Sequence, residues 1–164
     1  MWYPYYTMEH KTELFTFLKS QNLMSLATFG DTISNCYIYF AIDEDFNMYF
    51  ISEPDSTHCK NIAIHNQVAC VVADSHQLVR SKKIGAHILG VVEDVSGIDR
   101  FEAILELWNS TNPGMESLIS INNFRNKILN SRAYKIRPTE IKFFNEELYG
   151  EEGFEILSLD QSKK

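Results

Sequence analysis

Residues 55–62, DSTHCKNI, bring a serine, a threonine, a histidine and a cysteine together within four positions. Two kinds of chemistry are open to them. His58 beside Cys59 could act as a base next to a nucleophile. Ser56 and Thr57 at the start of a helix could instead bind an anion through their hydroxyls and the first-turn N–H groups. The elements around this segment decide between the two.

Helix geometry disfavours a catalytic His58–Cys59 pair. Neighbouring residues of an α-helix point about 100° apart around its axis. If residues 55–66 are helical, Cys59 aligns with the apolar face and away from His58. Cys36 and Cys70 also lie in apolar or strand-like segments. Three cysteines without paired short spacings therefore predict buried, reduced thiols.

Histidine spacing disfavours a metal site. His58 and His65 lie seven residues apart, about 10.5 Å along a helix axis, which is too far for both to bind one small ion. His76 and His87 stand in other segments, without a short-spaced second ligand. The chain also lacks the glycine-rich phosphate loops and the nucleophile elbow. The helix start remains as the candidate site.

That helix start has two interpretations. Asp55, Ser56 or Thr57 could simply cap the helix, which is the usual role of such residues. The same hydroxyls and first-turn N–H groups could also hold a phosphate, which the helix dipole would stabilise. His58 and Lys60 would then add positive charge nearby.

The composition is that of an ordinary globular protein. The 164 residues are 45% hydrophobic, with 15 Lys and Arg against 22 Asp and Glu, for a net charge of −7. This net negative charge argues against a broad surface that binds nucleic acid or anionic membranes. No apolar run approaches the roughly 20 residues of a membrane helix, and the N-terminus lacks a secretory pattern. We expect one domain over residues 1–164, in a reducing cytoplasm, without nucleic-acid or membrane partners.

Hydrophobic periodicity predicts short antiparallel strands with a few helices. Besides the helix over residues 55–66, helical spacing appears at 9–20, 98–109 and 115–124. Strands are expected at 23–29, 32–42, 48–52, 68–74, 84–95, on either side of 137–139, and at 154–159. The strand over 68–74 is expected to be buried on both sides. Gly85 and Gly90 indicate a bulge, a barrel corner or a close backbone approach. The order suits a closed or partly closed β-barrel with peripheral helices.

Four segments in this order carry a resemblance: SLATF with its hairpin partner, YFISEPDSTHCKNIAIHNQVACVV, GAHILGVVEDV and YKIRPTEIKFF. They resemble the flavin-binding split-barrel superfamily of the pyridoxamine 5′-phosphate oxidase type, and the ending RPTEIKFFNEELYG is similar to a small, poorly characterised bacterial branch of it. The resemblance implies a mainly β (α+β) fold, a six- to seven-stranded antiparallel split β-barrel with peripheral helices. Its core spans about residues 9–148, followed by an acidic tail.

The resemblance also implies an FMN site. Flavin-binding members hold the FMN phosphate and ribityl chain with a threonine on the third strand and a Ser-Arg-Lys run at the following helix. By position, Ser52 matches the threonine, and Ser56, Thr57 and His58 match the run. The hydroxyls are kept, but two permanent cations are replaced, and histidine is charged only when protonated. Lys60 could compensate.

The second strand departs from the oxidase pattern as well. Asn35 and Phe40 stand where that branch often carries Arg and Lys. Asn35 could hydrogen-bond a flavin edge, whereas Phe40 could only pack. Residues 80–83, RSKK, form the densest basic cluster and are a further source of compensating charge. FMN binding is expected, and pyridoxamine-phosphate oxidation itself is not.

Three functions follow from this resemblance. The first is an FMN-dependent oxidoreductase without a catalytic side chain, acting on a small-molecule substrate, in which FMN supplies the redox chemistry. The second is a non-catalytic split barrel that binds flavin, haem or another anionic planar ligand. The third is a dimeric scaffold without a ligand. The superfamily implies a homodimer in which two barrels share the ligand groove.

Overall fold

The computed structural model describes residues 8–97, 101–126, 130–150 and 153–159. The strands are β1 (Leu23–Phe29), β2 (Ile33–Ile42), β3 (Met48–Ser52), β4 (Gln67–Ala73), β5 (Ile84–Asp94), β6 (Arg132–Asn145) and β7 (Phe154–Ser158). The helices are α1 (Met8–Ser20), α2 (Thr57–Ile64), α3 (Phe101–Thr111), α4 (Ile121–Arg125) and α5 (Glu146–Tyr149). None of these helices has the length and apolar character needed to span a membrane.

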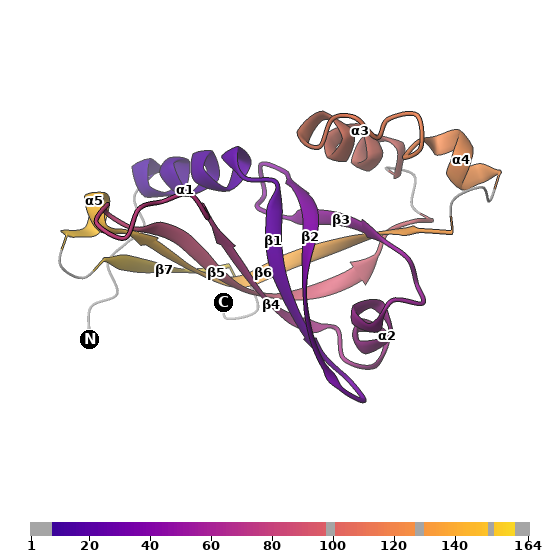
Figure 1. Cartoon of the computed structure of the whole chain (residues 1–164), viewed down its shortest axis with the longest axis horizontal. Coiled ribbons are helices and arrows are strands. Elements are labelled where there is room, and N and C mark those ends of the chain that lie inside the picture. The colour runs from indigo at the N-terminus through magenta and orange to yellow at the C-terminus, as the bar shows by residue number, and fades with distance from the viewer. Residues whose placement is uncertain (1–7, 98–100, 127–129, 151–152, 160–164) are drawn as a thin grey trace.

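The strands form one antiparallel sheet in the order β3-β2-β1-β4-β5-β6-β7 (Figure 1). A further antiparallel pairing between β3 and β6 closes six of them into a barrel, and β7 extends the sheet beyond it. The predicted mainly β, antiparallel barrel with peripheral helices is confirmed.

Side chains from most of the barrel strands fill its interior, with α1 and α2 contributing from outside the sheet. The largest fully buried side chains include Phe40, Phe50 and Phe143. Leu14 and Leu18 of α1 are completely buried in the same core. The amphipathic helix predicted over residues 9–20 therefore covers the barrel.

A second core lies between α3 and the barrel wall. Its members include Ala41, Tyr49, Leu105 and Trp108. The Trp108 indole Nε1 donates to Tyr39 O at 3.4 Å, which ties the helix to β2. The apolar stripe predicted for residues 98–109 thus packs as expected over its described part, which begins at Phe101; residues 98–100 lie outside the described residues.

Two sequence expectations are wrong in detail. The strand predicted as buried on both sides, β4, alternates between buried and exposed residues, because none of the described helices covers the outer side of this part of the wall. The helix predicted over 115–124 begins only at Ile121, where Ser120 caps α4 by accepting from Asn123 N. The residues before it form turns.

Gly90 marks a bulge between β5 and β6. Leu89 pairs with Glu140, but Gly90 pairs with Pro138, so one residue of β6 is left over. A proline is tolerated at such a position because the ladder is already interrupted. A Cβ added to Gly90 would lie 2.7 Å from Ile136 Cγ2. Both the bulge and the close approach expected from the sequence are present.

Candidate ligand-binding site at the start of α2

The barrel wall opens beside α2. Pairing between β2 and β3 ends at Phe40 and Phe50. The rest of β2 continues with β1 alone, whereas Ser52 at the end of β3 pairs with Arg132 of β6. His58, in the first turn of α2, reaches residues on both sides of this opening.

Three side chains from separate elements converge on the His58 imidazole. Its Nε2 lies 2.7 Å from Ser52 Oγ and 3.1 Å from Ser56 Oγ. Its Nδ1 lies 3.6 Å from Cys36 Sγ on β2. Contacts at both nitrogens fix the orientation of the ring. We refer to Cys36, Ser52, Ser56 and His58 as the His58 cluster.

Ser56 caps α2. Its backbone is extended, with φ −64° and ψ 151°, and its Oγ accepts a hydrogen bond from Cys59 N at 3.4 Å. From the sequence, Asp55, Ser56 or Thr57 could be the N-cap. In the structure the N-cap is Ser56. One hydroxyl therefore serves both the helix start and the imidazole of His58.

The other residues predicted for the phosphate lie outside the cluster. Thr57 is the first residue of α2, and its side chain is exposed, as is that of Lys60 one turn later. Only Ser52, Ser56 and His58 of the predicted helix-start residues contact one another. Thr57 and Lys60 face the solvent instead.

Asn35 also stands apart from the cluster. Alternate residues of a strand point to opposite faces, so Asn35 faces outward while Cys36 faces His58. Asn35 Oδ1 accepts a hydrogen bond from Ser25 Oγ at 2.7 Å. Within one chain, Asn35 and the helix-start residues lie on different sides of β2.

Cys59 is buried, with 4% of its surface exposed, and its backbone N–H donates to Ser56 Oγ. Burial raises the pKa of its thiol, the polar side chains of His58, Ser56, Tyr134 and Ser52 lower it, and the net pKa is lowered. The prediction that Cys59 lies on the buried, apolar side of the helix is confirmed. The His58 imidazole turns back toward the residues before the helix.

The other two thiols differ from Cys59. Burial, and then the nearby Cys59, raise the pKa of Cys36, which is only half-buried. Burial raises the pKa of Cys70 to about 12. All three cysteines are free thiols, and Cys59 and Cys70 are buried as predicted, whereas Cys36 is not fully buried. Among the residues that the structure describes, no group of three or more His, Cys, Asp or Glu side chains could hold a metal ion.

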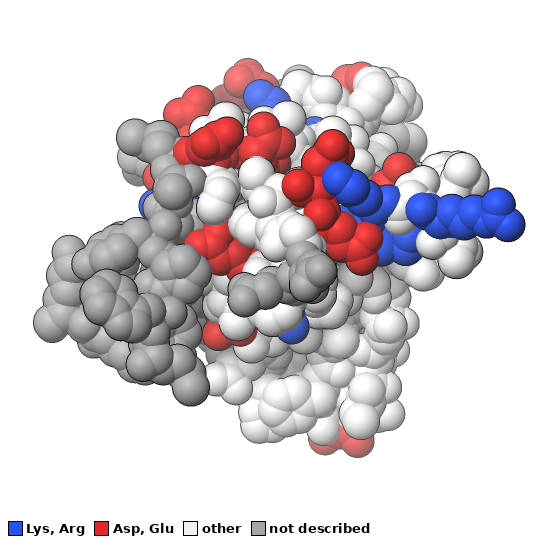
Figure 2. All heavy atoms as spheres, turned by 90° about the vertical axis from the view of Figure 1, so that its left-hand side faces the viewer, with Lys and Arg blue, Asp and Glu red and all other residues white. Residues whose placement is uncertain are grey.

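The basic cluster of residues 80–83 lies away from the His58 cluster. It follows β4 whereas α2 precedes β4, and the seven residues of that strand extend about 23 Å. The cluster lies beside α5, at the left-hand end in Figure 1. Figure 2 shows acidic side chains gathered on that end, with basic ones projecting beside them.

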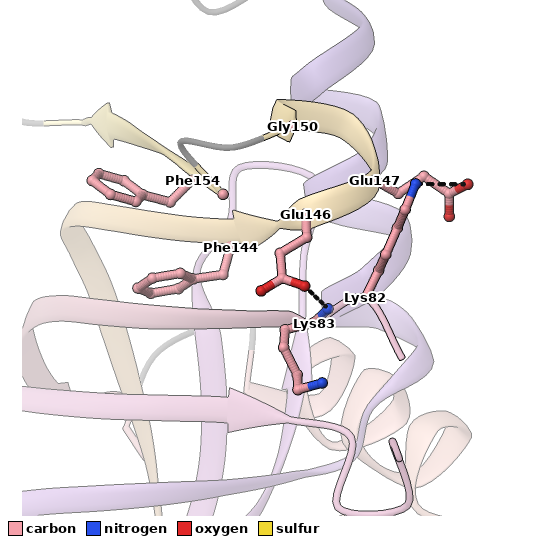
Figure 3. Close-up of a pocket in the computed structure, with 8 residues that line it drawn as sticks. Lys82, Lys83, Phe144, Glu146, Glu147, Gly150 and Phe154 are labelled. Carbon is pink, nitrogen blue, oxygen red and sulfur yellow. Dashed lines mark hydrogen bonds and ion pairs between the residues drawn. The ribbon is translucent and has the colours of Figure 1, made fainter. Parts of the chain in front are cut away.

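The lysines of this basic cluster contact nearby glutamates and backbone carbonyls. Lys83 donates its backbone N–H to Glu146 Oε2 at 2.9 Å, and Lys82 Nζ lies 4.0 Å from Glu147 Oε1 (Figure 3). Lys83 Nζ also donates to carbonyls of its own loop. Within one chain these lysines do not replace the cations missing from the start of α2.

The outer face of β2, β1 and β4 is uncharged and largely apolar. The strand register places Ser25 beside Tyr37 on one side and Val71 on the other. Tyr37 is 78% exposed and Tyr39 is 53% exposed, and both lie on this face. We call this surface the outer β face. It consists of Leu23, Ser25, Ala27, Phe29, Ile33, Asn35, Tyr37, Tyr39, Gln67, Ala69, Val71 and Ala73.

Comparison with known proteins gives structural likeness without sequence likeness. No family model and no curated protein matches the chain. A heme binding protein from Mycobacterium smegmatis is 14% identical, with a TM-score of 0.71, and the match covers 90% of this chain and 57% of that one.

Two further solved structures share the fold. HutZ, the heme storage protein of Vibrio cholerae, is 11% identical, with a TM-score of 0.63 over 77% of this chain and 88% of its own. A FAD-binding protein from Mesorhizobium loti is 14% identical, with a TM-score of 0.59 over 79% of this chain and 88% of its own. At these identities the likeness concerns the fold, and this chain has the split-barrel fold of those heme-binding and FAD-binding proteins.

Proposed function

We propose that this chain is a flavoprotein that binds FMN at the start of α2. One observation carries the proposal: the Ser52 and Ser56 hydroxyls and the His58 imidazole converge at a helix N-terminus beside the opening of the barrel wall. Hydroxyls and imidazole donate hydrogen bonds to phosphate, and the helix dipole favours an anion there. Solved structures of the same fold include a FAD-binding protein.

The residues present fit a phosphate group. Ser52, Ser56, Thr57 and His58 would hold it, and Lys60 would add positive charge from the exposed side of α2. The binding is weaker than that of a site built from Arg and Lys, for two reasons. The hydroxyls already contact His58, so a phosphate replaces existing hydrogen bonds. His58 also contributes charge only in its protonated form.

A homodimer is part of this proposal. The twelve residues of the outer β face include no charged side chain, and Tyr37 and Val71 are exposed at its centre. A two-fold interface brings the same surface of two copies together, so an uncharged apolar patch avoids like-charge contacts. Asn35 belongs to this face. Packing a second copy there would place Asn35 in a groove shared by two barrels, where it would contact the flavin edge.

Bound FMN would supply hydride or electron transfer, while the protein binds and orients it. We therefore propose an FMN-dependent oxidoreductase without a catalytic side chain. The second candidate is a non-catalytic split barrel for a flavin- or haem-type ligand. The absence of Arg and Lys from the His58 cluster favours it, as do the heme-binding proteins of the same fold.

Titration of the purified protein with FMN, followed by flavin fluorescence quenching, tests the site. A Thr57→Ala/His58→Ala double variant should bind FMN more weakly by about 1 to 3 kcal/mol, the scale of lost buried or charge-assisted hydrogen bonds. Ser110→Ala, at an exposed position of α3, is the control and should bind as the wild type does. If no FMN binds to the wild type, the proposal fails.

Two further measurements separate the candidates. Reduction of bound FMN by NADH or NADPH supports the oxidoreductase. Binding of FMN without reduction, or binding of haem in a Soret titration, supports the non-catalytic alternative. A protein that binds neither ligand, and whose thermal stability neither ligand changes, is a scaffold.

A further inference from the structure

Ser52 of the candidate site faces an arginine across the sheet. In the antiparallel pairing of β3 with β6, Ser52 lies directly opposite Arg132. Two residues earlier in β3, Phe50 is paired with Tyr134; their rings are stacked, with centroids 5.0 Å apart, and both are buried in the barrel core. Directly opposed residues project from the same face of a sheet, with Cβ atoms about 5 Å apart. Arg132 therefore stands beside Ser52 at the rim of the barrel, next to the His58 cluster.

An acidic side chain on the other side of β6 holds this arginine. Arg132 Nη1 donates to Asp94 Oδ2 of β5 at 3.0 Å. The two side chains are 55% and 37% exposed, so water weakens this ion pair. Asp94 keeps a second partner without the arginine, because its Oδ1 accepts a hydrogen bond from Ser96 N at 2.9 Å. Arg132 can thus leave Asp94 at a small cost in free energy.

The strand of Arg132, β6, lies between the strands of Asp94 and Ser52. It pairs with β5 along one edge and with β3 along the other. Neighbouring strands are about 4.8 Å apart, a distance that the long arginine side chain spans in either direction. Rotation about its side-chain bonds carries the guanidinium toward β3, where Ser52 Oγ lies 2.7 Å from His58 Nε2. The fork of guanidinium N–H groups matches two oxygens of one phosphate.

We propose that Arg132 is the permanently charged phosphate-binding residue of the site at the start of α2, and that a bound phosphate replaces Asp94 as its partner. The inference rests on the proposed function for the phosphate site alone and does not require a flavin. Ser52, Ser56 and His58 contact the phosphate from one side, and Arg132 contacts it from β6. Arginine is always charged in proteins, so it supplies the permanent cation that the His58 cluster lacks.

The exchange makes Asp94 a competitor of the phosphate. Removing its carboxylate should strengthen phosphate binding, whereas removing the guanidinium of Arg132 should weaken it. An ion pair that only supported the fold of this region would behave differently, because the loss of either partner would then disturb the site in the same direction. Opposite effects at two residues that contact each other are therefore the signature of the exchange.

The test is an NMR titration of the isotopically labelled full-length protein with inorganic phosphate at constant ionic strength. It follows the Arg132 Nε–H and the backbone N–H of Cys59, which donates to Ser56 Oγ. Both signals should shift in a saturable way in the wild type. Arg132→Gln should weaken phosphate binding about 10- to 100-fold, the scale of a lost hydrogen bond to a charged group. Asp94→Asn should strengthen it about two- to fivefold, the scale of an exposed ion pair.

Arg137→Gln is the matched control. Arg137 is also an exposed arginine of β6, about 17 Å along the strand from Arg132. Its replacement changes the net charge of the protein by the same amount and should leave phosphate binding as in the wild type. A comparable loss of binding in both arginine variants would show that phosphate responds to net charge alone, and would overturn the proposal.

Two other outcomes overturn it: no saturable shift in the wild type, or unchanged phosphate binding in Arg132→Gln. If that variant fails to fold, the titration of Asp94→Asn decides, because weaker or unchanged binding contradicts the exchange. A parallel titration with FMN separates this inference from the flavoprotein proposal. Phosphate binding that depends on Arg132, without any binding of FMN, refutes the flavoprotein and keeps the role of Arg132. FMN binding that Arg132→Gln leaves unchanged refutes only that role.

Discussion

Asn61 of α2 donates a hydrogen bond from Nδ2 to Thr28 Oγ1 of β1 at 3.2 Å, across 33 positions in the sequence. The same nitrogen donates to Thr32 O at 2.8 Å. Asn61 and Thr28 are each only 3% exposed. This buried contact ties α2 to the β1–β2 hairpin and so fixes the helix that carries His58.

Replacing Asn61 should destabilise the protein. Asn61→Ala removes both hydrogen bonds and leaves the buried Thr28 hydroxyl without this donor, so the free energy of unfolding should fall by about 1 to 3 kcal/mol. Urea unfolding followed by circular dichroism measures the change. Asn66→Ala, at an exposed position after α2, should change stability by less than about 0.5 kcal/mol. Equal effects at the two positions would contradict the structural role of Asn61.

A side chain at Gly90 should destabilise the bulge. The Cβ of Gly90→Ala would lie 2.7 Å from Ile136 Cγ2 and 2.9 Å from Arg137 O. Overpacking of this kind costs about 1 to 3 kcal/mol, because backbone and core side chains must shift. The thermal midpoint should fall. Gly97→Ala is the matched control, since its Cβ would meet no atom of the described residues within 4 Å, and its thermal midpoint should stay near that of the wild type.

Asp94 should stabilise the fold in a pH-dependent way. Burial raises the pKa of its carboxyl, but hydrogen bonds from Ser96 and the contact with Arg132 Nη1 at 3.0 Å outweigh this and lower the pKa. A carboxyl with a lower pKa in the folded state stabilises that state above its unfolded pKa, about 3.9, and loses the effect as pH falls through the folded value.

The measurement compares Asp94→Asn with the wild type by urea unfolding at several pH values. At pH 7 the variant should be less stable by about 0.5 to 1 kcal/mol, a small amount because the side chain is 37% exposed. The difference should shrink as pH falls below about 4. Glu106→Gln, on the exposed side of α3, is the control. A difference that stays constant with pH would show that Asp94 acts without its charge.

The proposed dimer makes a prediction about the outer β face. Val71→Glu would place two carboxylates in an apolar two-fold interface, which is unfavourable because the charges repel and lose their hydration. Light scattering after gel filtration should show a dimer for the wild type and a monomer for the variant. Val79→Glu, in a loop where Val79 is 93% exposed, should remain dimeric. A wild type that is monomeric at micromolar concentration would contradict the interface.

Much of the fold could be predicted because the sequence patterns that indicate strands and bulges involve only neighbouring residues. Strand periodicity predicted the antiparallel strands β1, β2 and β3, and Gly90 in a strand pattern indicated a bulge as one of three alternatives. The open outer side of β4 could not be predicted. Its run VACVVA is apolar on both faces, and Val71 is exposed because no element in the described part of the chain covers that side.

Part of the candidate site could likewise be predicted from the sequence, and part could not. The sequence by itself determined that Ser56 and His58 stand at the start of a helix directly after a strand that ends at Ser52, because caps and strand ends are set by neighbouring residues. Only the tertiary structure decided that Asn35 faces away from them. It also decided that Cys36, 22 positions from His58, meets its ring. Both outcomes depend on where β2 stops pairing with β3, and that is fixed by the closure of the barrel through β6.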